Sequence, residues 1–351
     1  MRSGATRITF GALALRPGGS GVQTYIRELL RELNGLLPDA ELSAVVQRDA
    51  VGELPRGMAA QTRPVSSGAI RALHGALAGR TCELFHGLDV DLPLATPAFT
   101  VATVHDVSVY DMPSASSRFR AFGERRLVAY TLRKADLLLA VSEFTAERIH
   151  AISGRTATVV ELAPASWARP PSEDDVARTR RKYGLPDRFV IQVGTVEPRK
   201  NVHLVADAAE SIGLPCVLAG AGSQGPAAPR TAIGLGYIDV ADLPSLYAAA
   251  TVTAYASHYE GYGLPPVEAM ACGGAVVASA VGALPQVVSN GAVLVDSAET
   301  EDWSKALRTI AFDEAARSEL VTNALAVAGA LTWRRTAEQT VQAYRDAGVV
   351  P

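Results

Sequence analysis

The chain has 351 residues, of which 48 % are apolar and 20 % are charged, a balance that excludes a disordered chain or a coiled coil. Its 33 lysines and arginines against 36 aspartates and glutamates leave a net charge of −3. No nucleic-acid partner is expected, because such a binder needs a basic surplus to neutralise phosphates. Three scattered cysteines, Cys82, Cys216 and Cys272, predict neither a disulfide framework nor a zinc site.

Short apolar runs alternate with amphipathic stretches along the first half of the chain. The run at 8–15 predicts a strand rather than a signal peptide, because it is short and passes directly into a Pro-Gly-Gly turn. Residues 22–36 predict a helix, since their apolar residues recur with helical spacing. Ser142 is the expected N-cap of a later helix. Further strands are predicted at 42–46, 84–86, 99–104, 137–141 and 158–162, and further helices at 118–133 and 143–152.

Three prolines crowd residues 163–172, and the alternation then resumes. The uncharged run 269–295 is long enough to raise a membrane span, but glycines and a proline cut it into pieces of strand length. No transmembrane segment is therefore predicted, and the expected location is cytoplasmic or peripheral at the inner face of the membrane. Strands are predicted at 189–193, 216–219, 251–255, 275–278 and 292–295, and a final helix at 333–347.

This strand–helix alternation indicates the α/β class, with parallel sheets covered by helices on both faces. At about 150 residues per domain, the length predicts two domains. The proline-rich break places an N-terminal Rossmann-like domain at 1–168 and a C-terminal one at 169–332. The remaining residues, 333–351, predict a helix that packs back toward the first domain.

Two glycine-rich strand ends could hold an anion. Residues 18–21 read Gly-Gly-Ser-Gly between the first strand and the first helix, where backbone N–H groups and the helix dipole favour a phosphate. Gly194 ends a strand of the second half, and the adjacent cations Arg199 and Lys200 follow it. Adjacent cations beside the carboxyl end of a strand suit a diphosphate. Taken alone, each motif is equally well explained as a tight turn or as solvated charges.

The segment 257–270 is the most informative part of the chain. Its glycines, Gly261 and Gly263, free the backbone ahead of a helix whose first turn contains two prolines. Glu260 precedes that helix, and Glu268 lies about one turn inside it. Two carboxylates that bracket a glycine-rich helix start indicate recognition of sugar and ribose hydroxyls. The alternative is one capping acid and one exposed acid.

With residues 193–201 and 18–21, this segment resembles the retaining glycosyltransferases of family 4, whose fold is GT-B. Glu260 and Glu268 match the two ends of the family's Glu-x7-Glu signature. The resemblance covers nearly the whole chain. Within the family, the sequence is most similar to the mannosyltransferase-like branch. The resemblance implies two Rossmann-like, doubly wound domains that face a central cleft, with the acceptor on the N-terminal side and the donor on the C-terminal side.

The resemblance also implies roles for individual residues. Arg199 and Lys200 would hold the donor diphosphate, Glu260 and His105 would face the transferred sugar, and these four form the catalytic set. Asp106 would lie on the acceptor side. The implied donor-binding residues are Gly19, Ser20, Gly194, Arg199, Lys200, Ile238, Glu260, Gly261, Tyr262, Gly263, Leu264 and Glu268.

The implied reaction transfers a sugar, with retention, from a GDP-, UDP- or dTDP-linked donor to a hydroxyl acceptor. The acceptor would be a glycan or a specialised metabolite. Fixed cations and helix dipoles stabilise the leaving group, so that no metal and no other cofactor is expected. The oligomeric state is left open.

Four alternatives compete with this interpretation. Asp89 and Asp91 form an Asp-x-Asp after a strand, the metal-binding motif of the other large glycosyltransferase fold. A non-transferring enzyme on the same architecture, such as a sugar-nucleotide 2-epimerase, would use the same donor site. A binding protein without catalysis and a retaining glycosidase that uses Glu260 and Glu268 are weaker. Glycosidase acids usually come from separate strand ends that face each other across a sugar.

Overall fold

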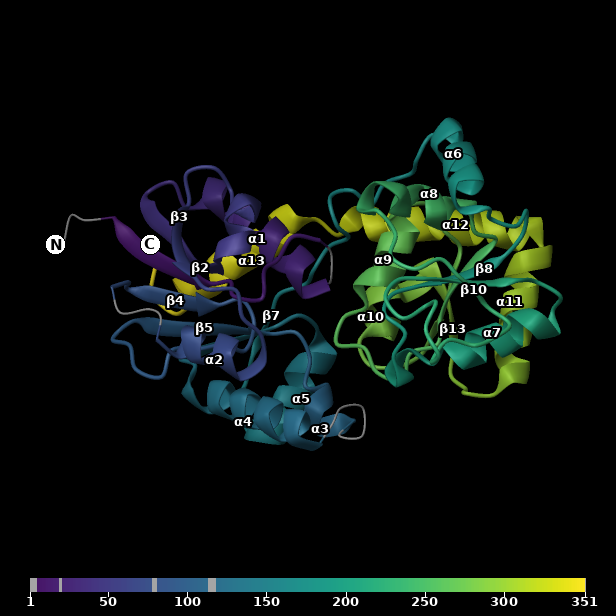
Figure 1. Ribbon diagram of the computed structural model, residues 1–351. Coiled ribbons are helices and arrows are strands. Elements are labelled where there is room, and N and C mark those ends of the chain that lie inside the picture. Colours follow the sequence, from purple (N-terminus) through teal and green to yellow (C-terminus); the bar gives the residue numbers. More distant parts are fainter. Residues whose placement is uncertain (1–4, 19–20, 78–80, 113–117, 351) are drawn as a thin grey trace. The chain divides into compact units, whose positions relative to one another are not determined.

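The computed structural model describes residues 5–18, 21–77, 81–112 and 118–350. The chain divides into two compact units, shown in Figure 1. Unit 1 comprises Met1–Leu162 and Thr332–Pro351, and unit 2 comprises Ala163–Leu331. The chain therefore crosses from unit 1 to unit 2 in the proline-rich stretch and returns only for its last helix.

Unit 1 has a parallel sheet, which in the described residues contains seven strands in the order β3-β2-β1-β4-β5-β6-β7. The order reverses between β1 and β4, the topological switch point of a doubly wound sheet. The first strand ends at Gly11, earlier than predicted, and Ala12–Leu15 forms a buried loop instead. The strands are β1 (Thr6–Gly11), β2 (Ala40–Gln47), β3 (Ala59–Arg63), β4 (Leu84–Gly87), β5 (Phe99–Val104), β6 (Leu137–Ala140) and β7 (Thr158–Val159).

The helices predicted at 22–36, 118–133, 143–152 and 333–347 are all present in unit 1, whereas two shorter helices, at 68–76 and 108–111, were not predicted. The first confirms the prediction for 22–36 and buries its apolar stripe, including Ile26 and Leu29. Ser142 is confirmed as an N-cap, since its hydroxyl accepts a hydrogen bond from the Thr145 N–H at 3.1 Å. The helices are α1 (Gly21–Leu36), α2 (Gly68–Ala76), α3 (Ser108–Asp111), α4 (Arg118–Lys134), α5 (Glu143–Ser153) and α13 (Trp333–Asp346).

A buried polar network attaches the C-terminal helix α13 to unit 1. The Tyr344 hydroxyl of α13 is 2.6 Å from His86 Nδ1, and His86 Nε2 is 2.8 Å from the Thr103 hydroxyl on β5. Burial lowers the pKa of His86 to about 3, so the ring is neutral and can donate one bond and accept the other. The network therefore fixes the returning helix without burying a charge.

Unit 2, all of whose residues are described, has a six-stranded parallel sheet in the order β10-β9-β8-β11-β12-β13. Its switch point lies between β8 and β11. Alternate residues of β8 pack into different cores, Val190 on one face and Ile191 on the other, so both faces are covered. The strands are β8 (Val190–Val193), β9 (Cys216–Ala219), β10 (Ile233–Gly234), β11 (Val252–Tyr255), β12 (Val276–Ser279) and β13 (Ala292–Val295).

The uncharged run 269–295 consists of short elements, as its turn residues predicted: the end of α9, then β12, α10 and β13. In the described part of the chain, no helix combines the length and apolarity needed to cross a membrane. The helices of unit 2 are α6 (Glu173–Tyr183), α7 (Val202–Ser211), α8 (Leu243–Ala249), α9 (Leu264–Ala271), α10 (Leu284–Val288), α11 (Thr300–Phe312) and α12 (Glu314–Ala330).

Candidate functional site

The predicted donor residues of unit 2 gather at its switch point, where β8 and β11 run side by side. β8 ends at Val193 and leads through Gly194 to the short 3₁₀ helix Pro198–Lys200. Gly194 has φ +142°, and its carbonyl oxygen would be 2.3 Å from a Cβ at Gly220. Glycines are therefore favoured at both strand ends: Gly194 by its positive φ, and Gly220 by its positive φ and by the close approach of the Gly194 carbonyl oxygen.

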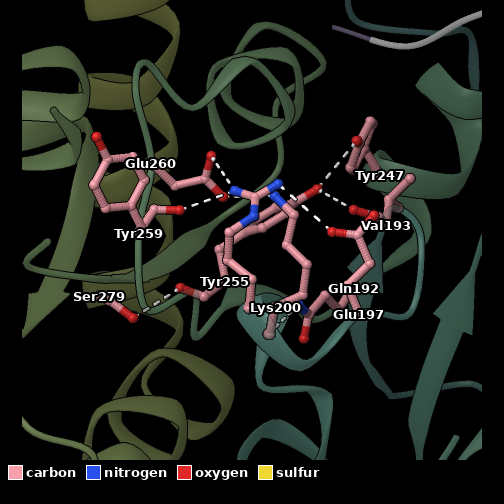
Figure 2. A network of polar contacts seen from close by, with 10 residues as sticks. Gln192, Val193, Glu197, Lys200, Tyr247, Tyr255, Tyr259, Glu260 and Ser279 are labelled. Atoms are coloured by element: carbon pink, nitrogen blue, oxygen red, sulfur yellow. Dashed lines mark hydrogen bonds and ion pairs between the residues drawn. The ribbon is translucent and has the colours of Figure 1, made fainter. Parts of the chain in front are cut away.

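Two cations converge on one carboxylate at this edge. The Lys200 ammonium is 2.5 Å from Glu260 Oε1, and Arg199 Nη1 is 3.5 Å from Glu260 Oε2. Arg199 Nη1 also donates to the Tyr259 carbonyl oxygen at 2.9 Å. Figure 2 shows Lys200 and Glu260 pointing toward each other from separate loops. The sequence assigned these three residues to one site, and the structure brings them into contact.

The electrostatics of the cluster are set by burial and pairing. The Lys200 and Glu260 side chains are only 11 % and 9 % exposed. Burial raises the pKa of Glu260, but Lys200 and Arg199 lower it more, so its pKa lies below the ordinary value. The carboxylate is therefore ionised at neutral pH, and each cation has a partner in the absence of any ligand.

Polar side chains that the sequence analysis did not single out form hydrogen bonds to the backbone around the cluster. Gln192 Nε2 donates to the Lys200 carbonyl oxygen at 2.8 Å, and the Tyr255 hydroxyl donates to the Val193 carbonyl oxygen at 2.9 Å. The Tyr247 hydroxyl lies 3.4 Å from that of Tyr255 (Figure 2). A polar Gln192 inside an otherwise apolar strand was the available signal, since a buried amide needs a partner.

The loop before α9 provides backbone donors. Gly263 caps the helix with φ +100°, and Pro265 and Pro266 occupy the first turn, where they have no N–H groups. The N–H groups of Gly263 and Leu264 donate to no other residue of the described chain. A Cβ at Gly263 would be 2.4 Å from Leu284 Cδ2, so the loop is held tightly against α10.

Glu268 lies in α9, whereas Glu260 lies in the loop before that helix. The two carboxylates differ in their surroundings, because no cation in the part of the chain that the structure describes is paired with Glu268. Its side chain is buried, and its carboxylate has no hydrogen bond or ion pair within the described chain. Burial alone raises the pKa of Glu268 to about 7. One carboxylate of the signature is thus paired with cations, and the other has no hydrogen-bond or ion-pair partner in the described chain and is only partly ionised at pH 7.

A pocket of about 190 Å³, lined by both polar and apolar side chains, opens next to this cluster, around the carboxyl ends of β11, β12 and β13. It contains none of the predicted site residues, although Asn201 and His258 in its wall are close neighbours of Lys200 and Glu260 in sequence. His258 is tied to the cluster through its backbone, since its N–H donates to the Arg199 carbonyl oxygen at 2.8 Å. The walls of the pocket also include Ser257, Ser279, Asp296 and Ser297.

The remaining predicted residues have mixed outcomes. Gly19 and Ser20 lie outside the described residues. Ile238 is buried in the core of unit 2, so only its backbone can face a ligand. Gly261 and Tyr262 are also buried in the loop before α9.

Unit 1 contains the other two predicted residues, His105 and Asp106. His105 Nε2 is 2.9 Å from the Leu88 carbonyl oxygen, and since a carbonyl only accepts, Nε2 bears the proton. If the ring is neutral, Nδ1 is then left as an acceptor. Asp106 Oδ1 accepts bonds from the Ser108 N–H and hydroxyl at 2.9 and 2.6 Å, which organises the start of α3.

An arginine lies beside both acids of the Asp-x-Asp motif on which the metal-dependent alternative rests. Arg71 Nη2 is 3.7 Å from Asp89 Oδ2, and Arg71 Nε is 3.7 Å from Asp91 Oδ2. Burial, together with the charge of Asp89, raises the pKa of Asp91 to about 6 despite Arg71. A guanidinium thus takes the position between these carboxylates that a cation would need.

A family model described as "Glycosyl transferases group 1" matches residues 175–327, which lie in unit 2. The O-antigen chain mannosyltransferase B of Escherichia coli is 30 % identical over 282 residues, which cover 75 % of this chain and 74 % of that protein. This chain belongs to the group 1 glycosyltransferases. The D-inositol 3-phosphate glycosyltransferase of Actinosynnema mirum is 32 % identical to this glycosyltransferase over 284 residues, covering 73 % of it and 67 % of the relative.

Solved structures show the same fold at lower identity. Sucrose-phosphate synthase of Thermosynechococcus elongatus superposes with a TM-score of 0.76 at 20 % identity, covering 98 % of this glycosyltransferase and 99 % of that chain. Anabaena HepE, solved with UDP and glucose, gives 0.75 at 20 % identity over 97 % and 99 % of the two chains. The fold is therefore GT-B, as the resemblance implied. Because the relatives are transferases, the 2-epimerase alternative is not favoured.

Replacing Lys200 tests the buried ion pair. In Lys200→Met the Glu260 carboxylate stays buried with only the more distant Arg199, and the free energy of unfolding in urea should fall by about 3–5 kcal/mol. Arg199→Met should cost less, and Lys200→Met/Glu260→Gln should recover part of the loss, since it removes both charges. Lys305→Met, at an exposed lysine of α11, is the control and should change little. Equal losses at Lys200 and Lys305 would contradict the pairing.

Glu268→Gln tests the raised pKa. The folded pKa of about 7 exceeds the ordinary glutamate pKa of 4.5, so the folded protein holds an extra proton between these pH values. This carboxylate therefore makes stability fall as pH rises from 4.5 to 7, by up to about 3 kcal/mol, with no further loss above. Urea denaturation at pH 5 and pH 8 should show Glu268→Gln gaining on the wild type at the higher pH. The exposed Glu210→Gln should follow the wild type, and a Glu268→Gln profile parallel to wild type would refute the shift.

Proposed function

We propose that this glycosyltransferase is a metal-independent, retaining enzyme of family 4, similar to its mannosyltransferase-like branch. It moves a sugar from a nucleotide-diphosphate sugar to a hydroxyl of a glycan or specialised metabolite. The observation that supports this most directly is the convergence of Lys200 and Arg199 on Glu260 at the switch point of unit 2. Ligands of open α/β sheets bind at such points.

The diphosphate binds to the cations. Lys200 and Arg199 are fixed in position by backbone hydrogen bonds and by Glu260, and phosphate oxygens can accept from the same ammonium and guanidinium groups. The N–H groups of Gly263 and Leu264 add two donors at the start of α9. Gly194 leaves room for the phosphates beside β8.

The two glutamates contact different parts of the donor. Glu268 accepts hydrogen bonds from the vicinal hydroxyls of ribose, which supply the partners that its buried carboxylate lacks. Glu260, which remains ionised, faces the transferred sugar. On unit 1, His105 serves the sugar through Nδ1, and Asp106 serves the acceptor.

The reaction needs no protein nucleophile. The bond from the anomeric carbon to the phosphate oxygen breaks, and its electron pair goes to the diphosphate, where Lys200 and Arg199 offset the new charge. The acceptor oxygen bonds to the same face of the anomeric carbon, which retains the configuration. Its proton passes to the departing phosphate oxygen, so charge and atoms balance.

The comparisons support the donor class and the type of sugar. Anabaena HepE was solved with UDP-glucose and with UDP, and the curated relatives include Escherichia coli mannosyltransferases. We therefore infer a nucleotide-linked hexose, with GDP, UDP and dTDP as the candidate carriers.

Product analysis tests the proposal. Each candidate sugar nucleotide is first screened for thermal stabilisation of the protein, because a ligand that binds the folded state raises its apparent stability. The product formed from the stabilising donor should have the donor's anomeric configuration by NMR, and EDTA should leave the rate unchanged. An inverted product would exclude retention, and loss of rate in EDTA that Mg²⁺ restores would exclude metal independence.

Two substitutions test the division between the glutamates. A hydrogen bond to a charged group contributes about 1.5–3 kcal/mol, so Glu268→Gln should weaken binding of both the bare nucleoside diphosphate and the sugar nucleotide by roughly ten- to a hundredfold. Glu260→Gln should leave bare diphosphate binding nearly intact and lower kcat by about two orders of magnitude. Calorimetry gives both affinities, with Glu210→Gln as control. Equal losses of bare diphosphate affinity in the two variants would refute the assignment.

A further inference from the structure

The pocket at the carboxyl ends of β11, β12 and β13 is lined by residues outside the proposed donor site. Its walls include Leu204, Ala256 and Val295, which belong to the core on the face of the sheet that α7 and α11 cover. Ile238, which the resemblance assigns to the donor, packs into the core of the opposite face. The pocket is therefore separate from the nucleotide side of the donor site, and its lining needs its own explanation.

Three polar side chains around this pocket are not bonded to the protein. The side chains of Asn201, His258 and Asp296 make no hydrogen bond or ion pair to any residue that the structure describes. They come from three places in the sequence: the start of α7, the loop after β11 and the loop after β13. An amide, an imidazole and a carboxylate are therefore available to one ligand in the pocket.

The rest of the lining combines hydroxyl groups with apolar surface. A serine lies at or just after the end of each of the three strands: Ser257, Ser279 and Ser297. Hydroxyl, amide and imidazole groups both donate and accept hydrogen bonds, as the hydroxyls of a sugar do. Val281 and Val295 add apolar wall against which the C–H groups of a ring can pack. This lining matches an amphipathic polyhydroxyl ring.

Charge and size narrow the choice of ligand. Among the residues that line the pocket, all of them described, Asp296 has a carboxylate and none is a lysine or an arginine. An anion would lie beside this carboxylate without a compensating cation, whereas the hydroxyls of a neutral sugar can donate to it. The volume of about 190 Å³ is smaller than the roughly 300–1,000 Å³ of pockets for drug-sized ligands, so the pocket suits one ring.

We propose that this pocket binds a single sugar ring, either as a free hexose or as one unit of a glycan. Asp296, Asn201 and His258 bond to the ring hydroxyls. The proposal goes beyond the transfer reaction and does not depend on it, because it rests on the lining of the pocket alone. Asn201 follows Lys200 directly, and His258 precedes Glu260 by two positions. A sugar bound here therefore contacts both loops that carry the buried ion pair.

Saturation-transfer difference NMR on the full chain tests the proposal. D-mannose and D-glucose should each give a saturable signal, and citrate, an anion of similar size, should give none. Ala298→Phe fills the pocket from an exposed position of its wall and should abolish the hexose signal. Asp296→Ala should weaken hexose binding about tenfold. Both positions are exposed, so circular dichroism and the thermal midpoint should match the wild type.

A linear mannotriose distinguishes the two sources of the ring. If it binds more tightly than mannose and loses this binding in Ala298→Phe, the pocket takes one unit of a glycan. If it binds no more tightly than mannose, the pocket takes a free hexose.

Matched controls come from the same unit. Ala315→Phe and Asp207→Ala change exposed residues of α12 and α7, and should bind hexoses as the wild type does. Glu260→Gln separates the pocket from the donor site, since hexose binding should persist in it. Absence of a hexose signal, an equal signal from citrate, or equal losses in test and control variants would overturn the proposal. A hexose signal that Glu260→Gln abolishes and Ala298→Phe preserves would also overturn it, because the sugar would then lie in the donor site.

Discussion

The proposed donor site depends on a buried ion pair between Lys200 and Glu260, residues sixty positions apart in the sequence. Removing two charges from water is costly, and the cost is offset only where geometry and additional hydrogen bonds are good. The parallel sheet meets this requirement by placing the ends of β8 and β11 side by side. Gln192 holds the Lys200 backbone, and Gly282 lets a second loop pass close to Glu260, whose carbonyl oxygen would be 2.2 Å from a Cβ there. The cluster is thus built before any ligand arrives.

The same segment shows how environment differentiates two identical side chains. Glu260 is surrounded by cations and keeps its charge, whereas burial without a partner raises the pKa of Glu268 to about 7. Pairs of acids whose pKa values are driven apart commonly have separate tasks. Here the ionised acid lies beside Lys200 and Arg199, the groups proposed to balance a leaving diphosphate, and the acid without a partner lacks hydrogen-bond donors. The energetic cost of leaving Glu268 unpaired is consistent with a ligand that supplies them.

The sequence predicted the doubly wound architecture because strand and helix periodicities are local signals. It missed β3 and β10, since β3 is half exposed at the sheet edge and β10 has only two residues, too few to show a pattern. It grouped Arg199, Lys200 and Glu260 by motif, but their mutual contact is a tertiary fact that no spacing encodes. The tautomer of His105 likewise depends on the Leu88 carbonyl oxygen, seventeen residues away. A polar residue in an apolar strand marks Gln192 in the sequence, but its partner, the Lys200 carbonyl oxygen, is known only from the folded chain.

Helix α2 demonstrates a different limit of sequence reasoning. Its apolar residues recur with the spacing that normally predicts a buried stripe, yet the buried side is the one with Gly75, which packs close to Leu13 and Asp91. Close packing of the backbone onto the Arg71–Asp91 pair requires small residues there, which directs leucine and isoleucine outward. A buried charge without a partner and an exposed apolar surface without a cover are both unfavourable in water. In unit 2 the fold itself supplies the partners for Glu260, whereas in unit 1 the packing of α2 leaves Ile70 and Leu73 exposed.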